Sequence, residues 1–366
     1  MEGNRSLNVA LVGYGYWGPK LVRNIRDCAY FHLKYLIDQE ETVLRDFSFS
    51  NPDITILTDI QAALEDESID AIIIATPPKM HYELAKKSLL AGKHILVEKP
   101  FTTSFKEASE IVALAEKVSK KVMVDFTFLY NGTIQSIKEQ IDKQTFGQIL
   151  YVDSVRINLG IFQNDVNVVW DLACHDLSIF NYLLEELPLS VQAIGIDGLG
   201  NGLENIAYVH LKYSELFAQI NCSWSSPVKI RRMLLGGSKR AILYNDIEPT
   251  DKIKVYDKGV VNQNSLERES LLQDYRMGEV YIPKYDTTEP LQNVVTTFYN
   301  TIIYNKKSKS EGEDALLVMF MLEMIQKSIN LGGKEVKIEW EQVGQSLYSY
   351  ITSKGMLKEP SKALKK

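Results

Sequence analysis

The chain has 366 residues, of which 45% are hydrophobic and 24% are charged, and its formal net charge at pH 7 is −6. This length exceeds one ordinary hydrophobic core, so we expect a globular protein of two domains. The acidic balance argues against nucleic acid or an anionic membrane surface as the main partner. A transmembrane helix needs a run of about 18 apolar residues, which the sequence lacks.

The N-terminal residues lead directly into a predicted strand and lack the pattern of a signal peptide. The cysteines, Cys28, Cys174 and Cys222, are widely spaced and form no CxxC pair. Both features predict a cytoplasmic protein with reduced thiols, and we expect no bound metal.

Apolar segments alternate with helical patterns over the first 125 residues. We predict strands at residues 7–12, 31–38, 70–78, 93–100 and 120–126, and helices at residues 17–28, 59–65, 80–91 and 104–117. Ser104 and Glu107 form a capping box at the start of the last helix. The alternation predicts a parallel, doubly wound sheet, which is a Rossmann dinucleotide-binding domain over residues 1–125.

The pattern changes after Asp125. The later elements are predicted helices at residues 132–143, 170–184, 291–304 and 311–330, and extended segments at residues 151–158, 189–197, 204–213, 216–224, 229–237, 240–245 and 252–256. Turn residues separate many of the extended segments, which is typical of an antiparallel sheet. Residues 258–288 are irregular, and the tail from Lys358 is polar. We therefore predict an α/β protein whose C-terminal α+β domain, residues 126–366, has a large, mostly antiparallel open sheet.

A glycine-rich loop of the form GxGxxG follows the first predicted strand and opens the first predicted helix. Gly13 permits a tight turn, Gly15 lets the backbone approach a pyrophosphate, and Gly18 allows close helix packing. The helix N-terminus supplies N–H donors. This setting predicts a dinucleotide site, in which we include the intervening Tyr16 and Trp17.

Asp38 ends the second predicted strand, about twenty residues past the glycine loop. Its carboxylate would bind the ribose hydroxyls and repel a 2′-phosphate, so we expect NAD rather than NADP. Thr76 and Pro77 lie where another strand ends, at the edge of the sheet that binds ligands. His81, just beyond, either assists the cofactor or caps the next helix.

Glu98 and Lys99 close a predicted buried strand, directly before Pro100. A lysine at this edge would face the nicotinamide end of the cofactor, although a surface lysine at a strand end is the common alternative. Apolar surroundings lower the pKa of a lysine, and a neighbouring carboxylate raises it. Whether the Lys99–Pro100 bond is cis stays open.

Asp171 and His175 are four residues apart in a predicted helix and therefore share a face. Asn167 is in position to cap that helix. Histidine exchanges protons near neutral pH, and the aspartate would orient it or hold a substrate hydroxyl. The alternative is a surface pair that stabilises the helix by about a few tenths of a kcal/mol. Cys174 is assigned to packing.

The glycine loop, the Glu-Lys-Pro tripeptide and the D-x-x-x-H pair together resemble the glucose–fructose oxidoreductase/inositol dehydrogenase/MocA family, over essentially the whole chain. The resemblance implies an N-terminal nucleotide domain and a C-terminal domain whose open sheet forms a homodimer or homotetramer. It also implies that Lys99, Asp171 and His175 are the catalytic residues.

Finer features, such as GYWGPKLVRN and the segment that contains WDLACHD, resemble the sugar-nucleotide branch of this family. That resemblance implies NAD-dependent hydride transfer at C3 of a sugar nucleotide such as UDP-N-acetylglucosamine. We expect His175 to be the acid/base and Lys99 to polarise the developing oxyanion. The implied substrate contacts, besides the catalytic residues, are Tyr130, Asn131, Arg156, Asn158, Gln163 and Asn167.

Each implied contact has a structural alternative. Arg156, or Arg231 with Arg232, would meet a diphosphate or carboxylate, or would only solvate a strand face. The asparagines would bind sugar hydroxyls, or would serve as caps and turn residues.

Three other functions stay open. The chain could oxidise a free polyol such as an inositol, use NAD transiently during glycoside cleavage, or regulate a partner without catalysis. The presence of Lys99, Asp171 and His175 argues against the regulator.

Overall fold

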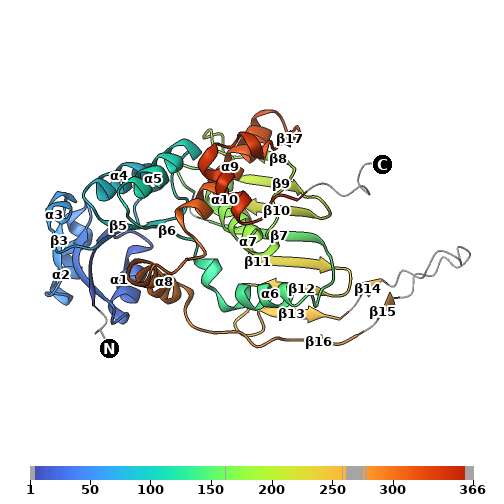
Figure 1. Cartoon of the computed structure of the whole chain (residues 1–366), viewed down its shortest axis with the longest axis horizontal. Helices are drawn as coiled ribbons and strands as arrows, with labels where there is room; N and C mark the ends of the chain where they lie inside the picture. The colour runs from blue at the N-terminus through green and yellow to red at the C-terminus, as the bar shows by residue number, and fades with distance from the viewer. Residues whose placement is uncertain (1–4, 161, 258, 261–274, 277, 359–366) are drawn as a thin grey trace, which may run out of the picture. The chain divides into compact units, whose positions relative to one another are not determined.

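The computed structural model describes residues 5–160, 162–257, 259–260, 275–276 and 278–358. The chain divides into two compact units. The first comprises Met1–Asn131 and Thr288–Phe320, and the second comprises Gly132–Thr287 and Met321–Lys366. Each unit contains its own large sheet (Figure 1).

A six-stranded sheet of order β3-β2-β1-β4-β5-β6 forms the centre of the first unit. Every neighbouring pair in it is parallel, so the carboxyl ends of all its strands meet at one edge. Its strands are β1 (Leu7–Val12), β2 (Phe31–Ile37), β3 (Thr55–Leu57), β4 (Ala71–Ile74), β5 (His94–Glu98) and β6 (Val122–Asp125). The central strands are buried almost throughout, which explains their continuous apolar sequences. The predicted Rossmann sheet is confirmed.

All four helices predicted within the first 125 residues are present in the first unit, as α1, α3, α4 and α5. In α5, Ser104 Oγ accepts a hydrogen bond of 3.2 Å from Glu107 N, as the capping box predicts. The helices are α1 (Gly18–Asp27), α2 (Glu41–Ser50), α3 (Gln61–Glu65), η1 (Pro78–Met80), α4 (His81–Leu90), α5 (Phe105–Lys117), η2 (Thr127–Tyr130) and α8 (Pro290–Tyr304). Neither α2 nor β3 was predicted. Among the described side chains of α2, only Leu44 is buried, so the helix has little apolar periodicity, and β3 has only three residues.

The first unit takes in a segment from far along the chain. Helix α8 packs against α1 and η2, and Val124 N donates a hydrogen bond of 2.9 Å to Ser310 O. Residues 288–320 therefore belong with the first sheet, whereas we expected a single division after residue 125. A single boundary in the sequence cannot separate the two units, because the chain returns to the first unit at residue 288.

A nine-stranded sheet of order β16-β13-β12-β11-β7-β10-β9-β8-β17 forms the centre of the second unit (Figure 1). Its neighbours are antiparallel except for the parallel pair β7 and β10, so the predicted mostly antiparallel sheet is confirmed. Its strands are β7 (Ile149–Leu159), β8 (Ser190–Ile196), β9 (Ile206–Lys212), β10 (Phe217–Ser223), β11 (Ser225–Gly237), β12 (Ala241–Asn245), β13 (Ile253–Tyr256), β16 (Val280–Tyr281) and β17 (Val336–Lys337).

One face of this sheet contributes to the core of the second unit. Strand β9 shows the alternation, since Ala207, Val209 and Leu211 are buried while Tyr208 and Lys212 are exposed. The helical elements of this unit are α6 (Gly132–Asp142), the π-helical turn η3 (Val169–Ala173), α7 (Cys174–Leu184), the second part of α9 (Gly312–Asn330), η4 (Trp340–Gln342) and α10 (Gln345–Ser353).

The segment that we expected to be irregular contains a small two-stranded sheet of β14 (Gly259–Val260) and β15 (Tyr275–Arg276). Residues 258, 261–274 and 277 within that segment, and residues 359–366 of the polar tail, lie outside the described residues. In the part of the chain that is described, no helix combines the length and the apolar character that crossing a membrane requires.

A buried ion pair fixes α7 to β7. Asp176 accepts from Arg156 Nε at 2.9 Å and from Arg156 Nη2 at 3.1 Å, and Ser154 Oγ donates to it at 2.8 Å. Burial lowers the pKa of Arg156, but neighbouring acidic groups, Asp176 first among them, offset this, so the pKa is raised above its ordinary value. Because a buried charge needs its partner, this contact sets which side of α7 faces the sheet.

Candidate active site

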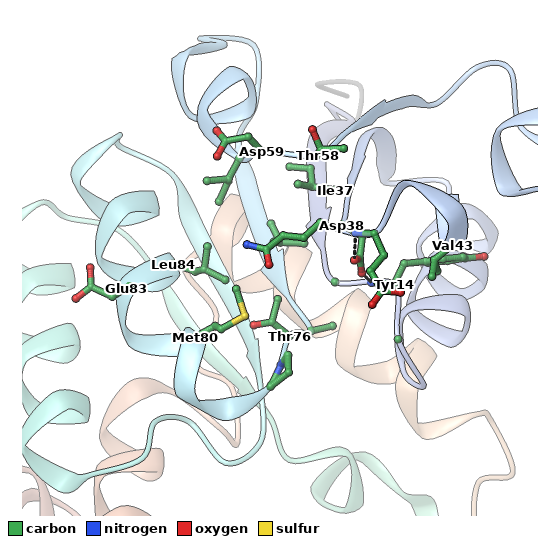
Figure 2. Close-up of a pocket in the computed structure, with 18 of the residues that line it drawn as sticks. Tyr14, Ile37, Asp38, Val43, Thr58, Asp59, Thr76, Met80, Glu83 and Leu84 are labelled. Atoms are coloured by element: carbon green, nitrogen blue, oxygen red, sulfur yellow. Dashed lines mark hydrogen bonds between the residues drawn. The ribbon is translucent and has the colours of Figure 1, made fainter. Parts of the chain in front are cut away.

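A pocket of about 740 Å³ opens at the carboxyl edge of the first unit's sheet. The loop after β1, the residues that follow β2 and β4, and the start of α4 line it. Figure 2 shows Tyr14 and Asp38 on one side of the pocket and Met80 and Leu84 on another. This is the edge at which open α/β sheets bind their ligands.

The glycines of the loop differ in what a side chain would meet. Gly13 has φ +98°, and a Cβ there would lie 2.5 Å from Ala75 O. A Cβ on Gly18 would lie 2.8 Å from Gly13 O, so this glycine is needed for close packing. A Cβ on Gly15 would meet nothing within 4 Å. Gly15 lines the pocket and leaves open space beside its backbone, which would let a pyrophosphate approach closely.

Asp38 holds the glycine loop in place. Its Oδ2 accepts a hydrogen bond of 2.7 Å from Tyr14 N, drawn in Figure 2, and its Oδ1 accepts one of 3.0 Å from Glu40 N. Each carboxylate oxygen has a second lone pair, so Asp38 retains acceptor sites for hydroxyl groups. The sequence indicated only a ligand contact here and missed this bond to the loop.

Thr76 gives an independent reason to expect a polar ligand. Its Oγ1 is buried and has no hydrogen-bond partner among the residues that the structure describes. Thr76 and Pro77 both line the pocket. Because buried hydroxyls are normally satisfied, an unsatisfied one in a pocket wall fits a ligand group. Together with the open backbone at Gly15, it makes the pocket suitable for a dinucleotide.

His81 is fully buried and does not line this pocket. Its Nδ1 lies 2.9 Å from Pro100 O, and its Nε2 lies 2.8 Å from Thr76 O. Carbonyl oxygens only accept, so each ring nitrogen donates when both bonds are made. His81 therefore connects the segment after β4 to the segment after β5, and its direct contact with a cofactor stays a prediction.

Tyr16 and Trp17 also lie outside the lining of the pocket. Lys20 Nζ is 3.7 Å from the centre of the Tyr16 ring and 4.0 Å from that of the Trp17 ring. Both rings thus contact a cation of their own helix region, and their role in cofactor binding stays a prediction.

Lys99 follows β5 at the same sheet edge and is half-buried. The Lys99–Pro100 peptide bond is cis. Glu98 is buried at the end of β5, opposite Asp125 of β6, and does not line the pocket. Asp125 was not predicted, because its proximity to Glu98 follows from strand register and not from spacing along the chain.

Asp171 and His175 lie in the second unit, and both are half-buried. The expected continuous α-helix over residues 170–184 is wrong in its first turn, because Asp171 lies in the π-helical turn η3 and His175 in α7. A π-helix bonds i to i+5, so the α-helical spacing does not apply across this interval. Asp171 Oδ2 accepts a hydrogen bond of 2.9 Å from Trp224 Nε1.

Trp224 is a residue that sequence reasoning missed. It is buried directly after β10, and β10 packs against η3. The indole N–H therefore fixes the orientation of the Asp171 carboxylate. Nothing in the spacing of Asp171 and Trp224 indicates this contact, which depends on the sheet order.

Asn167 caps the helix, as predicted. Its Oδ1 accepts from Val169 N at 3.1 Å and from Trp170 N at 3.2 Å. Its Nδ2 donates to Glu204 Oε2 at 2.6 Å and to Gln326 Oε1 at 2.7 Å. The whole amide is engaged by protein groups.

The other expected substrate contacts lie in both units. Tyr130, in the first unit, is buried with its hydroxyl 2.9 Å from Ser310 Oγ. Arg156 pairs with Asp176. Asn131, Asn158 and Gln163 are half-buried. Tyr130, Arg156 and Asn167 thus make hydrogen bonds to protein groups, which fits a structural role for each of them.

The contrast between two glycines yields a test of the pocket. Gly15→Val should preserve the thermal unfolding temperature and weaken NAD binding at least about tenfold, which corresponds to about 1.4 kcal/mol. Gly13→Ala should instead lower the unfolding temperature, because its φ and its contact with Ala75 O exclude a Cβ. Calorimetric titration with NAD and thermal unfolding of both variants check this. Unchanged NAD affinity in Gly15→Val would place the pyrophosphate elsewhere.

Two family models match successive parts of the chain. The family model described as an oxidoreductase family with an NAD-binding Rossmann fold matches residues 7–126. The model of the GFO/IDH/MocA C-terminal domain matches residues 134–243.

The curated relatives are distant. The uncharacterized oxidoreductase YdgJ of Escherichia coli (strain K12) is 25% identical over 263 residues, which is 68% of this chain and 73% of YdgJ. Inositol 2-dehydrogenase of Rhodococcus jostii (strain RHA1) is 27% identical over 203 residues, 53% of this chain and 54% of that enzyme. The chain thus spans about half the length of that dehydrogenase.

A solved structure, UDP-N-acetylglucosamine 3-dehydrogenase GnnA from Acidithiobacillus ferrooxidans, superimposes with a TM-score of 0.75. It is 18% identical and covers 90% of this chain and 99% of its own, a likeness that shows the fold. The two family models together match more than half of the residues. The chain belongs to the GFO/IDH/MocA family of oxidoreductases with an NAD-binding Rossmann fold.

Proposed function

We propose that this protein catalyses reversible hydride transfer between NAD and a ring carbon, C3, of a nucleotide-linked sugar of the UDP-N-acetylglucosamine class. One observation carries the proposal. Gly13, Asp38 and Thr76 surround a pocket after β1, β2 and β4, and Lys99 follows the adjoining strand β5. A dinucleotide pocket and a candidate proton-handling group therefore share one sheet edge within one unit.

The residues of the pocket suit NAD in particular. When bound, NAD supplies a nicotinamide that accepts or returns a hydride. Asp38 and Glu40 follow β2 and place negative charge where a ribose would bind. A 2′-phosphate would meet repulsion there, whereas ribose hydroxyls would donate to the carboxylate. Lys79 and Lys87 also line the pocket, but they come from η1 and α4 on another wall.

Asp38→Asn tests the choice of cofactor, because the amide oxygen still accepts from Tyr14 N while the charge is lost. We expect the ratio of kcat/KM for NAD to that for NADP to fall about tenfold, the effect of about 1.4 kcal/mol. Steady-state kinetics with both cofactors measure it. An unchanged ratio would show that the Asp38 charge does not select NAD.

The proton chemistry is assigned to residues of both units. His175 exchanges the proton of the sugar hydroxyl, and the Lys99 ammonium stabilises the oxyanion that develops. Asp171 orients the substrate or the imidazole, and its own bond from Trp224 supports this assignment. Asn131, Asn158 and Gln163 are the proposed hydroxyl contacts.

Lys99→Ala and His175→Ala should each lower turnover at least about a hundredfold, since each removes a proton-handling group. NAD affinity should stay nearly unchanged in both. The assay is NADH formation with UDP- and dTDP-linked sugars, and exposed His32→Ala serves as a control of the same residue type. Normal turnover in either variant would remove that residue from the mechanism.

A free polyol is the second candidate substrate, which the 27% identity to an inositol dehydrogenase over 203 residues favours. The same assay with free inositols distinguishes the two classes. Turnover with inositols and none with nucleotide sugars would replace our substrate proposal and leave hydride transfer intact.

We also propose that the protein forms a homodimer or homotetramer through the outward face of the nine-stranded sheet. Ile194, Tyr208 and Phe217 are 55%, 45% and 46% exposed. Ile194 is the register partner of Tyr208, and Phe217 is that of exposed Tyr151. An apolar surface of this kind typically marks an interface.

Tyr208→Glu should shift the protein towards monomer, because a charge on this face would be buried in the assembly. Leu90→Glu, at an exposed position in the first unit, is the matched control and should not change the mass. Sedimentation velocity measures both. A wild-type monomer, or a Tyr208→Glu variant of wild-type mass, would contradict the interface.

A further inference from the structure

Two acidic side chains end neighbouring strands beside Lys99. Glu98 is the last residue of β5 and Asp125 the last of β6, and the two are register partners in a parallel pair. Register partners project from the same face of a sheet. Glu98 is 7% exposed and Asp125 is 1% exposed, so neither carboxyl group is hydrated as a surface carboxylate would be.

The hydrogen bonds of this pair are incomplete. Asp125 Oδ1 accepts from Thr127 Oγ1 at 2.7 Å. Among the residues that the structure describes, no donor reaches Glu98 Oε1 or Asp125 Oδ2. Two ionised carboxylates only accept hydrogen bonds, but a protonated carboxyl group also donates one. A single proton between the two groups would satisfy both buried oxygens.

We propose that Glu98 and Asp125 share one proton and act as a positioning pair for Lys99, with a single negative charge between them. This inference rests on the proposed function for the role of Lys99, but the shared proton does not. Ionising both of two neighbouring buried carboxyl groups costs much free energy, so one of them retains its proton.

The pKa values of the pair agree with this arrangement. Burial raises the pKa of Glu98 well above its ordinary value, Asp125 raises it further, and the Lys99 ammonium lowers it. Burial raises the pKa of Asp125 to about 6, against the lowering effects of Thr127, Glu98 and Lys99. The charged groups that act on the pair are thus the two carboxyls and Lys99, while Thr127 contributes an uncharged hydroxyl. Because the two groups interact, their two pKa values describe the pair and not either residue alone.

The retained charge matters for Lys99. Lys99 acts electrostatically on both carboxyls, so one negative charge on the pair in turn favours the protonated form of Lys99, which is the form that stabilises an oxyanion. A fully ionised pair would add a second buried charge, and a neutral pair would withdraw the support. A single shared proton therefore avoids a second buried negative charge and still leaves one negative charge to favour the protonated form of Lys99.

The pair also makes stability depend on pH in a defined direction. Both carboxyls have raised pKa values in the folded state, so between their ordinary values and the raised ones the folded chain binds more protons than the unfolded chain. The contribution of the pair to stability is therefore present at low pH and is lost as the pH rises through about 6 and above.

Infrared spectroscopy of the full chain tests the shared proton without any substrate. Wild type should show the C=O band of a protonated carboxylic acid near neutral pH, and the Glu98→Gln/Asp125→Asn double variant should lack it. Separate ¹³C labelling of glutamate and of aspartate in wild type shows which carboxyl group gives the band, even if the double variant does not fold. Absence of the band from wild type near neutral pH would overturn the shared proton, whatever the enzyme's substrate is.

The pH–rate profile tests the role of the pair. Glu98→Gln leaves Asp125, whose pKa is about 6 in the wild type, to carry the single charge at alkaline pH, so the alkaline limb of kcat should keep its wild-type position. The double variant has no charge, so the pKa of Lys99 should fall and the alkaline limb should move about one pH unit lower. An alkaline limb that stays in place in the double variant would refute the positioning role. If no substrate is oxidised at all, the proposed function fails, and the infrared band still decides the shared proton.

Discussion

The parallel register of the first sheet is the constraint on which the site depends. Because every strand of that sheet runs in one direction, residues that are far apart in the chain end at the same edge. Gly13, Asp38, Thr76, Lys99 and Asp125 follow or close five of its strands. The glycine turn, the Asp38 carboxylate, the unsatisfied Thr76 hydroxyl and the carboxyl pair are therefore consequences of one arrangement, and each would lose its neighbours if a strand were reversed.

The candidate residues of the second unit, Asp171 and His175, lie on a helical segment that contacts to the protein hold in place. The Asp176–Arg156 ion pair fixes α7 on the sheet, and Asn167 closes the start of the helical segment. Trp224 then sets the orientation of Asp171. These three contacts are all made to protein atoms, so the helical segment is held in place without a ligand. Asp171 lies in the π-helical turn η3, and π-helical turns are frequent at functional sites.

The sequence predicted those parts of the fold that depend on interactions within short segments. Apolar runs, glycine spacing and the Ser104 cap are properties of short segments, and the Rossmann sheet and the antiparallel sheet followed from them. What was missed depends on contacts across the fold. Asp125 meets Glu98 only through strand register, Trp224 meets Asp171 only through packing on η3, and α8 returns to α1 from 263 residues beyond, counted from Asp27 to Pro290. Residue chemistry made Lys99 and His175 candidates, and the family resemblance supplied the catalytic roles that we propose for them.

The central proposal is that Lys99 and His175 act on one substrate hydroxyl. A crystal structure of the protein with NADH and a nucleotide sugar measures this most directly. The account predicts that Lys99 Nζ and a ring nitrogen of His175 both lie within about 3 Å of the same sugar oxygen. Lys99 and His175 on separate surfaces, with the sugar in contact with only one of them, would contradict it.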